Sequence, residues 1–232
     1  MYQDDSHTDS CVHCVKKCEV FQMLSEKELD MLYEKRSEAF YRPGEAIVKQ
    51  GAPVSHLISI SDGIVKLVLE TPNTPDIILS IHIHVFMIAG PGIYVDNRYH
   101  FSVVALTNAK ACFMDIRHLH EFIEQNHNFA KKFYRQIGLA SVQLYDRIRS
   151  LNQKNMAGRV SEIFLFLYHE IHRTNPFDLI LSRTELAQFA GITKESISRI
   201  LKDFKEEKII EITNDSVHIL DFSKLQSIAR IG

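Results

Sequence analysis

The feature that most constrains this chain is the stretch from Leu181 to Lys202, which predicts two short helices joined by a tight turn. Ser182 with Glu185 three residues later is a capping-box pattern, which satisfies free backbone amides at the start of a helix. Gly191 is suited to the turn, and Thr193 is a good capping residue for the second helix. The stretch therefore predicts a helix, a turn and a second helix in close succession.

The second of these helices is predicted to be amphipathic. Its apolar residues recur at three- and four-residue steps and face inward, at Ile197, Ile200, Leu201 and Phe204. The opposite face carries Glu195, Ser198, Arg199 and Lys202. In a DNA major groove, Arg can bind guanine, Glu can accept from cytosine N4, and Ser can bond either kind of base edge. By spacing alone, an ordinary helix pair with a solvated charged face fits equally well.

A hairpin signal follows the helix pair. Two short β-branched runs flank Asn214-Asp215, which is typical of a tight hairpin turn. A hairpin in this position indicates a wing, and the combination favours a DNA-binding domain with a recognition helix.

These residues resemble the Crp-Fnr family of bacterial transcription regulators. Glu195-x-x-Ser198-Arg199 is similar to the Fnr branch, whereas the cyclic-AMP receptor branch carries Gly before the Arg, and Lys194 stands where that branch has Arg. The resemblance implies double-stranded DNA and RNA polymerase as partners, and an inverted-repeat site similar to TTGAT. The residues implied to bind DNA are Arg183, Thr193, Lys194, Glu195, Ser198, Arg199 and Lys202.

Length and composition set broader limits. The chain has 232 residues, is 45% hydrophobic and has a formal net charge of −2, so two domains are expected and any DNA-binding surface must be a local patch. No apolar stretch reaches the length of a membrane span, and the acidic N-terminus lacks a signal-peptide pattern. We expect a cytoplasmic protein with no membrane partner.

Residues 45–116 read as short β-branched strands between turn residues, which indicates a sandwich or small barrel. Pro43-Gly44-Glu45 and Gly63 are among the positions that resemble the opening of the Crp-Fnr effector domain. The predicted fold class is α+β, with an N-terminal double-stranded β-helix (jelly-roll), a long dimerisation helix and a C-terminal winged helix-turn-helix. The predicted boundaries are a cysteine-bearing segment at 1–20, the effector domain at 21–118, the dimerisation helix at 119–153 and the DNA-binding domain at 154–232.

An apolar stripe from Phe122 to Leu151 predicts one long helix. The first turns are expected to pack on the β-domain. The rest of the stripe needs a partner, and the same helix of a second copy is the simplest, which gives a homodimer. Gly138 should weaken this helix locally by about 1 kcal/mol relative to Ala. The expected dimer interface is Phe133, Ile137, Ala140, Leu144, Ile148 and Leu151.

The nucleotide pocket of cyclic-nucleotide-binding relatives is not matched. Those relatives carry a Gly-Glu pair and an Arg-Ser/Thr-Ala run, where this chain has Ala89-Gly90 and Phe101-Ser102-Val103. A buried phosphate would lack its charge-assisted partners. Arg98 is close in sequence, but a solvated loop Arg is the favoured interpretation. We therefore do not expect a cyclic nucleotide to bind.

Three cysteines crowd into Cys11-x2-Cys14-x3-Cys18, and structural disulfides are not expected in a reducing cytoplasm. The strand that ends at Cys112 resembles the Fnr strand that carries a distant fourth cluster ligand. The resemblance implies a [4Fe-4S] cluster on Cys11, Cys14, Cys18 and Cys112. The chain departs from Fnr-like proteins in having three residues, where five are usual, between its second and third cysteines.

Other interpretations of the cysteines stay open. Zinc could take the same four thiolates, or three with His13, and Cys112 could be a small core residue with no metal at all. We predict a homodimeric regulator that responds to oxygen or redox state through the cluster. One alternative is the same regulator sensing haem, nitric oxide or a small organic ligand in the β-domain. Another is a zinc or redox protein whose C-terminal domain binds protein instead of DNA.

Two histidines form a further candidate site. His82 and His84 alternate on one predicted strand and share a face, which fits haem or a metal. Polar residues on the outer face of a surface strand explain them equally well and are the default. No Ser-His-Asp, paired-carboxylate or phosphate-loop pattern occurs, so an enzyme is not expected.

Overall fold

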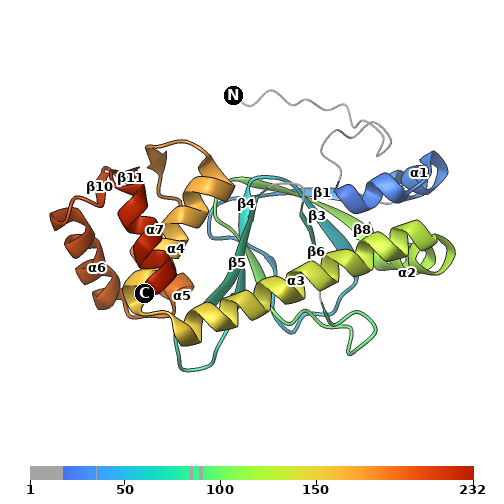
Figure 1. Ribbon diagram of the computed structural model, residues 1–232. Coiled ribbons are helices and arrows are strands. Elements are labelled where there is room, and N and C mark those ends of the chain that lie inside the picture. Colours follow the sequence, from blue (N-terminus) through green and yellow to red (C-terminus); the bar gives the residue numbers. More distant parts are fainter. Residues whose placement is uncertain (1–17, 35, 84–85, 89–90) are drawn as a thin grey trace. The chain divides into compact units, whose positions relative to one another are not determined.

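The computed structural model describes residues 18–34, 36–83, 86–88 and 91–232 (Figure 1). The strands of the N-terminal region form two four-stranded sheets, in the orders β1-β8-β3-β6 and β2-β7-β4-β5. The neighbours β1/β8, β3/β8, β3/β6 and β2/β7 are antiparallel. The strand bounds are β1 Ser37–Tyr41, β2 Ala46–Val48, β3 His56–Asp62, β4 Ile64–Leu69, β5 Ile77–Ile83, β6 Phe86–Ile88, β7 Ser102–Ala105 and β8 Ala109–Asp115.

The two sheets enclose an apolar core, which is why short β-branched runs can form them. In β3 the five residues between His56 and Asp62 are all buried. Leu57, Ile60, Ile78, Val103 and Ala111 are at most marginally exposed. This arrangement confirms the predicted jelly-roll effector domain. The first strand was missed by the sequence prediction, because the polar and aromatic residues of Ser37–Tyr41 lack a buried alternation.

Two compact units divide the chain, and each is described by itself. One unit contains residues 1–65 and 82–140, and the other contains residues 66–81 and 141–232. The division falls inside α3 (His127–Gln153), between Ala140 and Ser141. The predicted domain boundaries differ from this division and stay predictions.

The helices η1 (Glu19–Met23), α1 (Glu26–Glu34) and α2 (Ile116–Gln125) lie in the first unit. The single helix predicted from the apolar stripe is wrong in one respect, because α2 and α3 are separated by Asn126. Asn126 has an extended backbone, and its Oδ1 accepts from the Phe129 amide at 3.0 Å, which starts a new helix. Its Nδ2 donates to the Met23 carbonyl at 3.0 Å and so fastens η1 to this corner.

The second unit contains a winged helix-turn-helix fold. A three-stranded sheet of order β10-β11-β9 accompanies the helices. The core contains Phe164, Leu186, Ile197, Ile209 and Leu225. The elements are α4 Met156–Phe166, the π-helix η2 Leu167–His172, β9 Phe177–Asp178, α5 Arg183–Ala190, α6 Lys194–Glu206, β10 Ile210–Thr213, β11 Ser216–Ile219 and α7 Phe222–Ile231. Within the described ranges, no helix has both the length and the apolar character that a membrane crossing requires.

The expectation that His82 faces outward from a surface strand is wrong. His82 lies in β5 and is partly buried, and burial lowers its pKa from 6.5 to about 4. His84, the other histidine of that expectation, lies outside the described residues. Burial disfavours the charged form of an imidazole, so His82 is neutral in the folded protein at neutral pH.

We predict that this histidine makes the protein less stable in acid. Between pH 6.5 and 4 the unfolded chain binds a proton at His82 that the folded chain does not. The free energy of unfolding should therefore fall by about 3 kcal/mol as the pH is lowered through this range. Above pH 6.5 the contribution of the neutral His82 is fully present. Denaturant titrations at several pH values will measure the slope. His82→Gln should flatten it, whereas His127→Gln, which changes an exposed histidine, should leave it unaltered. Equal slopes in the wild type and His82→Gln would contradict the prediction.

Candidate DNA-binding surface and cysteine sites

The first helix of the motif, α5, begins at the predicted capping box. The Ser182 Oγ accepts from the Glu185 amide at 3.2 Å, and the Glu185 carboxylate accepts from the Ser182 amide at 2.8 Å. The helix ends at Gly191, whose φ of 62° is left-handed. The predicted caps and turn are therefore confirmed.

The second helix, α6, begins at Thr193, whose Oγ1 accepts from the Ser196 amide at 3.2 Å. Its apolar face is buried, as predicted, at Ile197, Ile200, Leu201 and Phe204. The remaining face is exposed and carries Lys194, Glu195, Ser198, Arg199 and Lys202. The structure thus brings five of the seven predicted DNA-binding residues to one face of one helix, with Thr193 at its start.

Polar contacts set the charge and the hydrogen-bonding capacity of the side chains on this face. The hydrogen bond from its own backbone amide and that from Thr193 lower the pKa of Glu195, so this carboxylate stays ionised and can only accept. The Ser198 hydroxyl donates to the Lys194 carbonyl at 3.1 Å. Lys202 forms an exposed pair with Glu206 at 3.6 Å, which solvent weakens, so its ammonium is available to a phosphate.

Arg183, the remaining predicted DNA-binding residue, lies at the first position of α5 and is partly buried. Its Nη1 atom is buried and has no hydrogen-bond partner within the described part of the chain. A helix N-terminus with an adjacent guanidinium attracts anions. This position suits a phosphate of the DNA backbone.

The predicted wing is present as the β10–β11 hairpin. Asn214 and Asp215 form its turn with φ values of 50° and 66°, which is the geometry that an Asn-Asp pair favours. The Asp215 carbonyl accepts from the Leu179 amide at 2.7 Å, so the turn is held by the segment that enters α5.

Residues outside the motif support the turn between α5 and α6, and no sequence pattern predicts them. Arg147, on α3, donates to the Phe189 carbonyl and lies over the Phe189 ring at 5.0 Å. A Cβ added at Gly191 would lie 2.7 Å from a methyl of Leu151. The last turns of α3 therefore pack against the helix-turn-helix. In the sequence, Arg147 is not distinguishable from the other charged residues that separate the apolar positions of this helix.

The predicted dimer residues differ in exposure. Phe133 is only 7% exposed and stacks on Phe129, so it packs within its own chain and is not available to a second copy. Leu151 is partly buried. Ala140 is exposed, as are Ile137, Leu144 and Ile148, whose side chains are 44 to 49% exposed.

Two of the four predicted metal ligands lie in the described residues, and both are free thiols. Cys18 is fully buried at the start of η1, where its Sγ receives the Gln136 amide group at 3.5 Å. Cys112 lies in β8, with its Sγ 3.7 Å from a Glu38 carboxylate oxygen and 3.9 Å from the Ser61 hydroxyl. Burial, followed by the Glu38 charge, raises the pKa of Cys112 to about 11. Cys11 and Cys14 lie outside the described residues.

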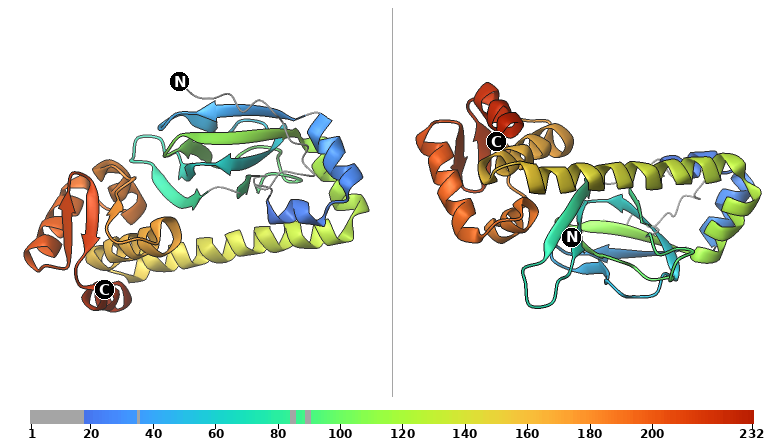
Figure 2. Two further views of the ribbon diagram at one scale, coloured as in Figure 1. Left: turned by 90° about the horizontal axis from the view of Figure 1, so that it is seen from above. Right: turned by 60° about the horizontal axis from the view of Figure 1, so that its bottom comes forward.

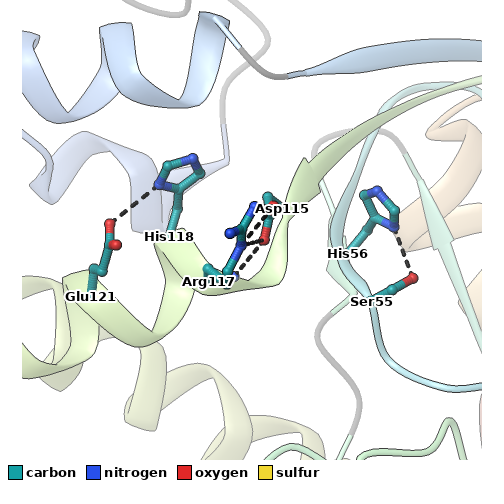
Figure 3. A network of polar contacts seen from close by, with 6 residues as sticks. All are labelled: Ser55, His56, Asp115, Arg117, His118 and Glu121. Carbon is teal, nitrogen blue, oxygen red and sulfur yellow. Dashed lines mark hydrogen bonds and ion pairs between the residues drawn. The ribbon is translucent and has the colours of Figure 1, made fainter.

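Other titratable groups form pairs instead of one site. At the β8–α2 corner, Asp115 accepts from Arg117, which holds the pKa of that carboxyl well below its usual range, and His118 lies 3.3 Å from Glu121 (Figure 3). Ser55 bonds the neighbouring His56 at 2.9 Å. Across the described ranges, no three His, Cys, Asp or Glu side chains are grouped to hold a metal ion.

The structure describes part of the region that corresponds to the nucleotide pocket of cyclic-nucleotide-binding relatives. Ser102 is buried, and its Oγ accepts from the Gln50 amide at 2.9 Å. Arg98 lies on the loop before β7, where its guanidinium donates to the Gly51 carbonyl at 2.6 Å. Ala89 and Gly90 lie outside the described residues. The Arg98 guanidinium is thus engaged by a loop contact.

The structure combines a jelly-roll domain, a long helix and a winged helix-turn-helix with a charged outer face. This combination defines the class of DNA-binding regulators that respond to a ligand or signal. Comparison with known proteins gives the family. Residues 38–126 match the cyclic nucleotide-binding domain, and residues 158–228 match the Crp-like helix-turn-helix domain.

Individual proteins agree with these matches. The transcriptional activator protein anr of Pseudomonas aeruginosa is 23% identical, with 94% of this chain and 92% of that protein covered. The fumarate and nitrate reduction regulatory protein of Vibrio cholerae is also 23% identical, with coverages of 95% and 92%. The structure of FixK2 from Bradyrhizobium japonicum has a TM-score of 0.75 at 16% identity, with 83% of this chain and 96% of that chain covered.

The chain belongs to the Crp-Fnr family and is a DNA-binding transcription regulator. Its relatives are regulators of transcription, so it is not an enzyme.

Proposed function

We propose that this regulator acts as a homodimer of the Fnr type, which reads an inverted repeat similar to TTGAT and responds to oxygen or redox state through a [4Fe-4S] cluster. The observation that carries the proposal is the outer face of α6, where Glu195, Ser198 and Arg199 are exposed together on a capped, well-packed helix. Similarity to the fumarate and nitrate reduction regulatory protein supports the Fnr assignment.

Dimerisation is supported by the exposed apolar side chains of α3. Tyr134, Ile137, Leu144 and Ile148 follow one another at steps of three, seven and four residues, and each is at least 44% exposed. An apolar stripe of this length on a surface marks a binding site for another chain. Two copies of α3 related by a two-fold axis would cover both stripes with one contact.

We predict that Leu144→Glu makes the protein monomeric. The change would bury an unpaired carboxylate at the interface, at a cost of about 3 to 5 kcal/mol. Sedimentation velocity will measure the mass, and Gln143→Glu is the matched control, because Gln143 is exposed on another face of the same helix. A Leu144→Glu protein that sediments as the wild-type dimer would show that α3 is not the interface.

The sensor is supported by the cysteine pattern and the Fnr-like relatives, and only in part by the described residues. Cys18 and Cys112 are free thiols, as cluster ligands must be before they bind iron. Their present neighbours, Gln136, Glu38 and Ser61, are not metal ligands of a shared site. If a cluster binds, Cys11, Cys14, Cys18 and Cys112 would hold it, and it would supply sensitivity to oxygen.

The anaerobically isolated protein is therefore predicted to be brown, with broad absorption near ~400 nm from its thiolate-ligated iron. Air should bleach it and weaken specific DNA binding. Cys112→Ser should reduce the bound iron, and metal analysis will measure both proteins. A colourless protein with stoichiometric zinc would show that the cysteines bind zinc and not a cluster. Iron binding that is undiminished in Cys112→Ser would show that Cys112 is not a ligand.

One alternative effector has its own support. Residues 38–126 match the cyclic nucleotide-binding domain, which is named for a small organic ligand. If the anaerobic protein contains neither iron nor zinc, we infer an organic ligand in the β-domain. The DNA-binding proposal would then still hold, because the α6 surface does not depend on the effector.

DNA recognition is inferred from the chemistry of the α6 face. In a two-fold dimer, the two α6 helices would enter successive major grooves roughly 34 Å apart. Arg199 is proposed to bind the guanine of the half-site, Glu195 the cytosine paired with it or a neighbouring base, and Ser198 a thymine. Lys194, Lys202 and Arg183 are proposed to neutralise phosphates.

Arg199→Ala should cost ~1 to 3 kcal/mol of binding to the matched site and relax discrimination at the guanine. Lys202→Ala is the matched comparison, since it should weaken binding to all DNA sequences alike. It should also reduce the slope of log K against log salt concentration by about one. Binding titrations on matched and guanine-substituted sites at several salt concentrations will separate the two effects. Equal losses on both sites in Arg199→Ala would make Arg199 a phosphate contact.

A further inference from the structure

A pair of strands that is far from the helix-turn-helix in the sequence contacts its first helix. Residues 66–81, which include most of β4 and β5, belong to the same compact unit as residues 141–232 (Figure 2). The Lys66 ammonium, on β4, donates to a carboxylate oxygen of Glu185, on α5, at 2.6 Å. An ion pair therefore joins these strands to the N-terminal turn of α5.

The C-terminal end of α5 is attached to the same strands. The Arg147 guanidinium donates to the Phe189 carbonyl of α5 and, at 3.5 Å, to the Ile78 carbonyl of β5. Both ends of α5 are thus connected to β4 and β5, one directly and the other through Arg147. The position of Lys66 beside α5 is therefore supported by more than one side chain.

Little solvent reaches the ion pair. The side chains of Lys66 and Glu185 are 12% and 22% exposed. The second carboxylate oxygen of Glu185 accepts from the Ser182 amide at 2.8 Å, in the capping box of α5. Although burial opposes it, the hydrogen bonds from Lys66 and Ser182 lower the pKa of Glu185, so the carboxylate is ionised at neutral pH. Lys66 compensates this half-buried negative charge.

The ion pair lies close to the residue that is proposed to contact a DNA phosphate. Arg183 is two residues before Glu185, and its buried Nη1 atom has no hydrogen-bond partner in the part of the chain that the structure describes. Residues two positions apart on a helix do not face each other, so Glu185 does not occupy Arg183 directly. Without Lys66, however, the carboxylate would repel a phosphate at this end of α5, because partly buried charges are weakly screened.

We propose that Lys66 is a positioning residue for DNA binding. By neutralising Glu185, it prevents this carboxylate from repelling the DNA backbone and leaves Arg183 to the phosphate. The inference rests on the phosphate contact that the proposed function gives to Arg183. It adds to the DNA-binding machinery a residue from outside the helix-turn-helix.

Binding of the full chain to a fluorescent DNA duplex of mixed sequence, at low salt, will test the proposal. Phosphate contacts do not depend on base sequence, so the result is independent of the TTGAT-like site. Lys66→Met should bind roughly fivefold more weakly than the wild type, and this ratio should shrink as the salt concentration is raised. Lys27→Met, which removes the same charge from an exposed position on α1, should change binding by less than about twofold.

Removal of the carboxylate separates a charge effect from a packing effect. Glu185→Gln keeps the capping box, because a glutamine can also accept from the Ser182 amide, and this variant should bind DNA no more weakly than the wild type. The double variant Lys66→Met/Glu185→Gln should return to within about twofold of the wild type, because it has no uncompensated charge. Circular dichroism will check that each variant is folded, and Glu185→Gln tests the sign of the effect by itself.

Three outcomes would overturn the proposal. Binding of Lys66→Met that equals or exceeds that of the wild type would show that the ion pair does not support DNA binding. Weaker binding of Glu185→Gln would show that the carboxylate does not repel the DNA. A double variant as weak as Lys66→Met would show that the lysine acts by packing.

Arg183→Gln, measured on the same duplex, distinguishes a failure of this inference from a failure of the proposed function. If Arg183→Gln weakens binding and Lys66→Met does not, the phosphate contact stands and Lys66 has no part in it. If neither variant weakens binding, the phosphate contact at α5 is wrong, and the role of Lys66 fails with it.

Discussion

The surface that this regulator offers to DNA depends on one left-handed residue. Gly191 turns the chain between α5 and α6 with a φ of 62°, and the place where a side chain would stand is filled by a methyl of Leu151. Any other residue would have to pay for both the backbone conformation and the contact. Because Leu151 belongs to α3, the angle between the two motif helices and their attachment to the long helix are set at the same point.

Local signals in the sequence predicted much of this architecture. Ser182, Gly191 and Thr193 act on residues within a few positions of themselves, so their patterns could be recognised without a structure. Asn214-Asp215 is another example, since its turn is determined by its own two residues. The outward set of α6 followed from helical periodicity once the caps had fixed where the helix begins.

What could not be predicted involves partners far apart in the sequence. Asn126 looked like one polar residue in a continuous stripe, but it ends α2, starts α3 and binds the Met23 carbonyl. His82 is partly buried, although its alternation with His84 indicated the outer face of a surface strand. Phe133 was indistinguishable from the exposed stripe residues, because whether an apolar side chain meets its own domain or another chain is decided by packing.

The hydroxyl of Ser198 donates its hydrogen bond to the Lys194 carbonyl. Toward a base edge it therefore presents lone pairs, in the same sense as the neighbouring Glu195 carboxylate. Two adjacent acceptors prefer amino groups, such as adenine N6 or cytosine N4, and a thymine opposite Ser198 would be met through its methyl group. Arg199, next to Ser198, supplies donors only, so the pair Glu195 and Ser198 and the guanidinium of Arg199 offer opposite polarities to neighbouring bases.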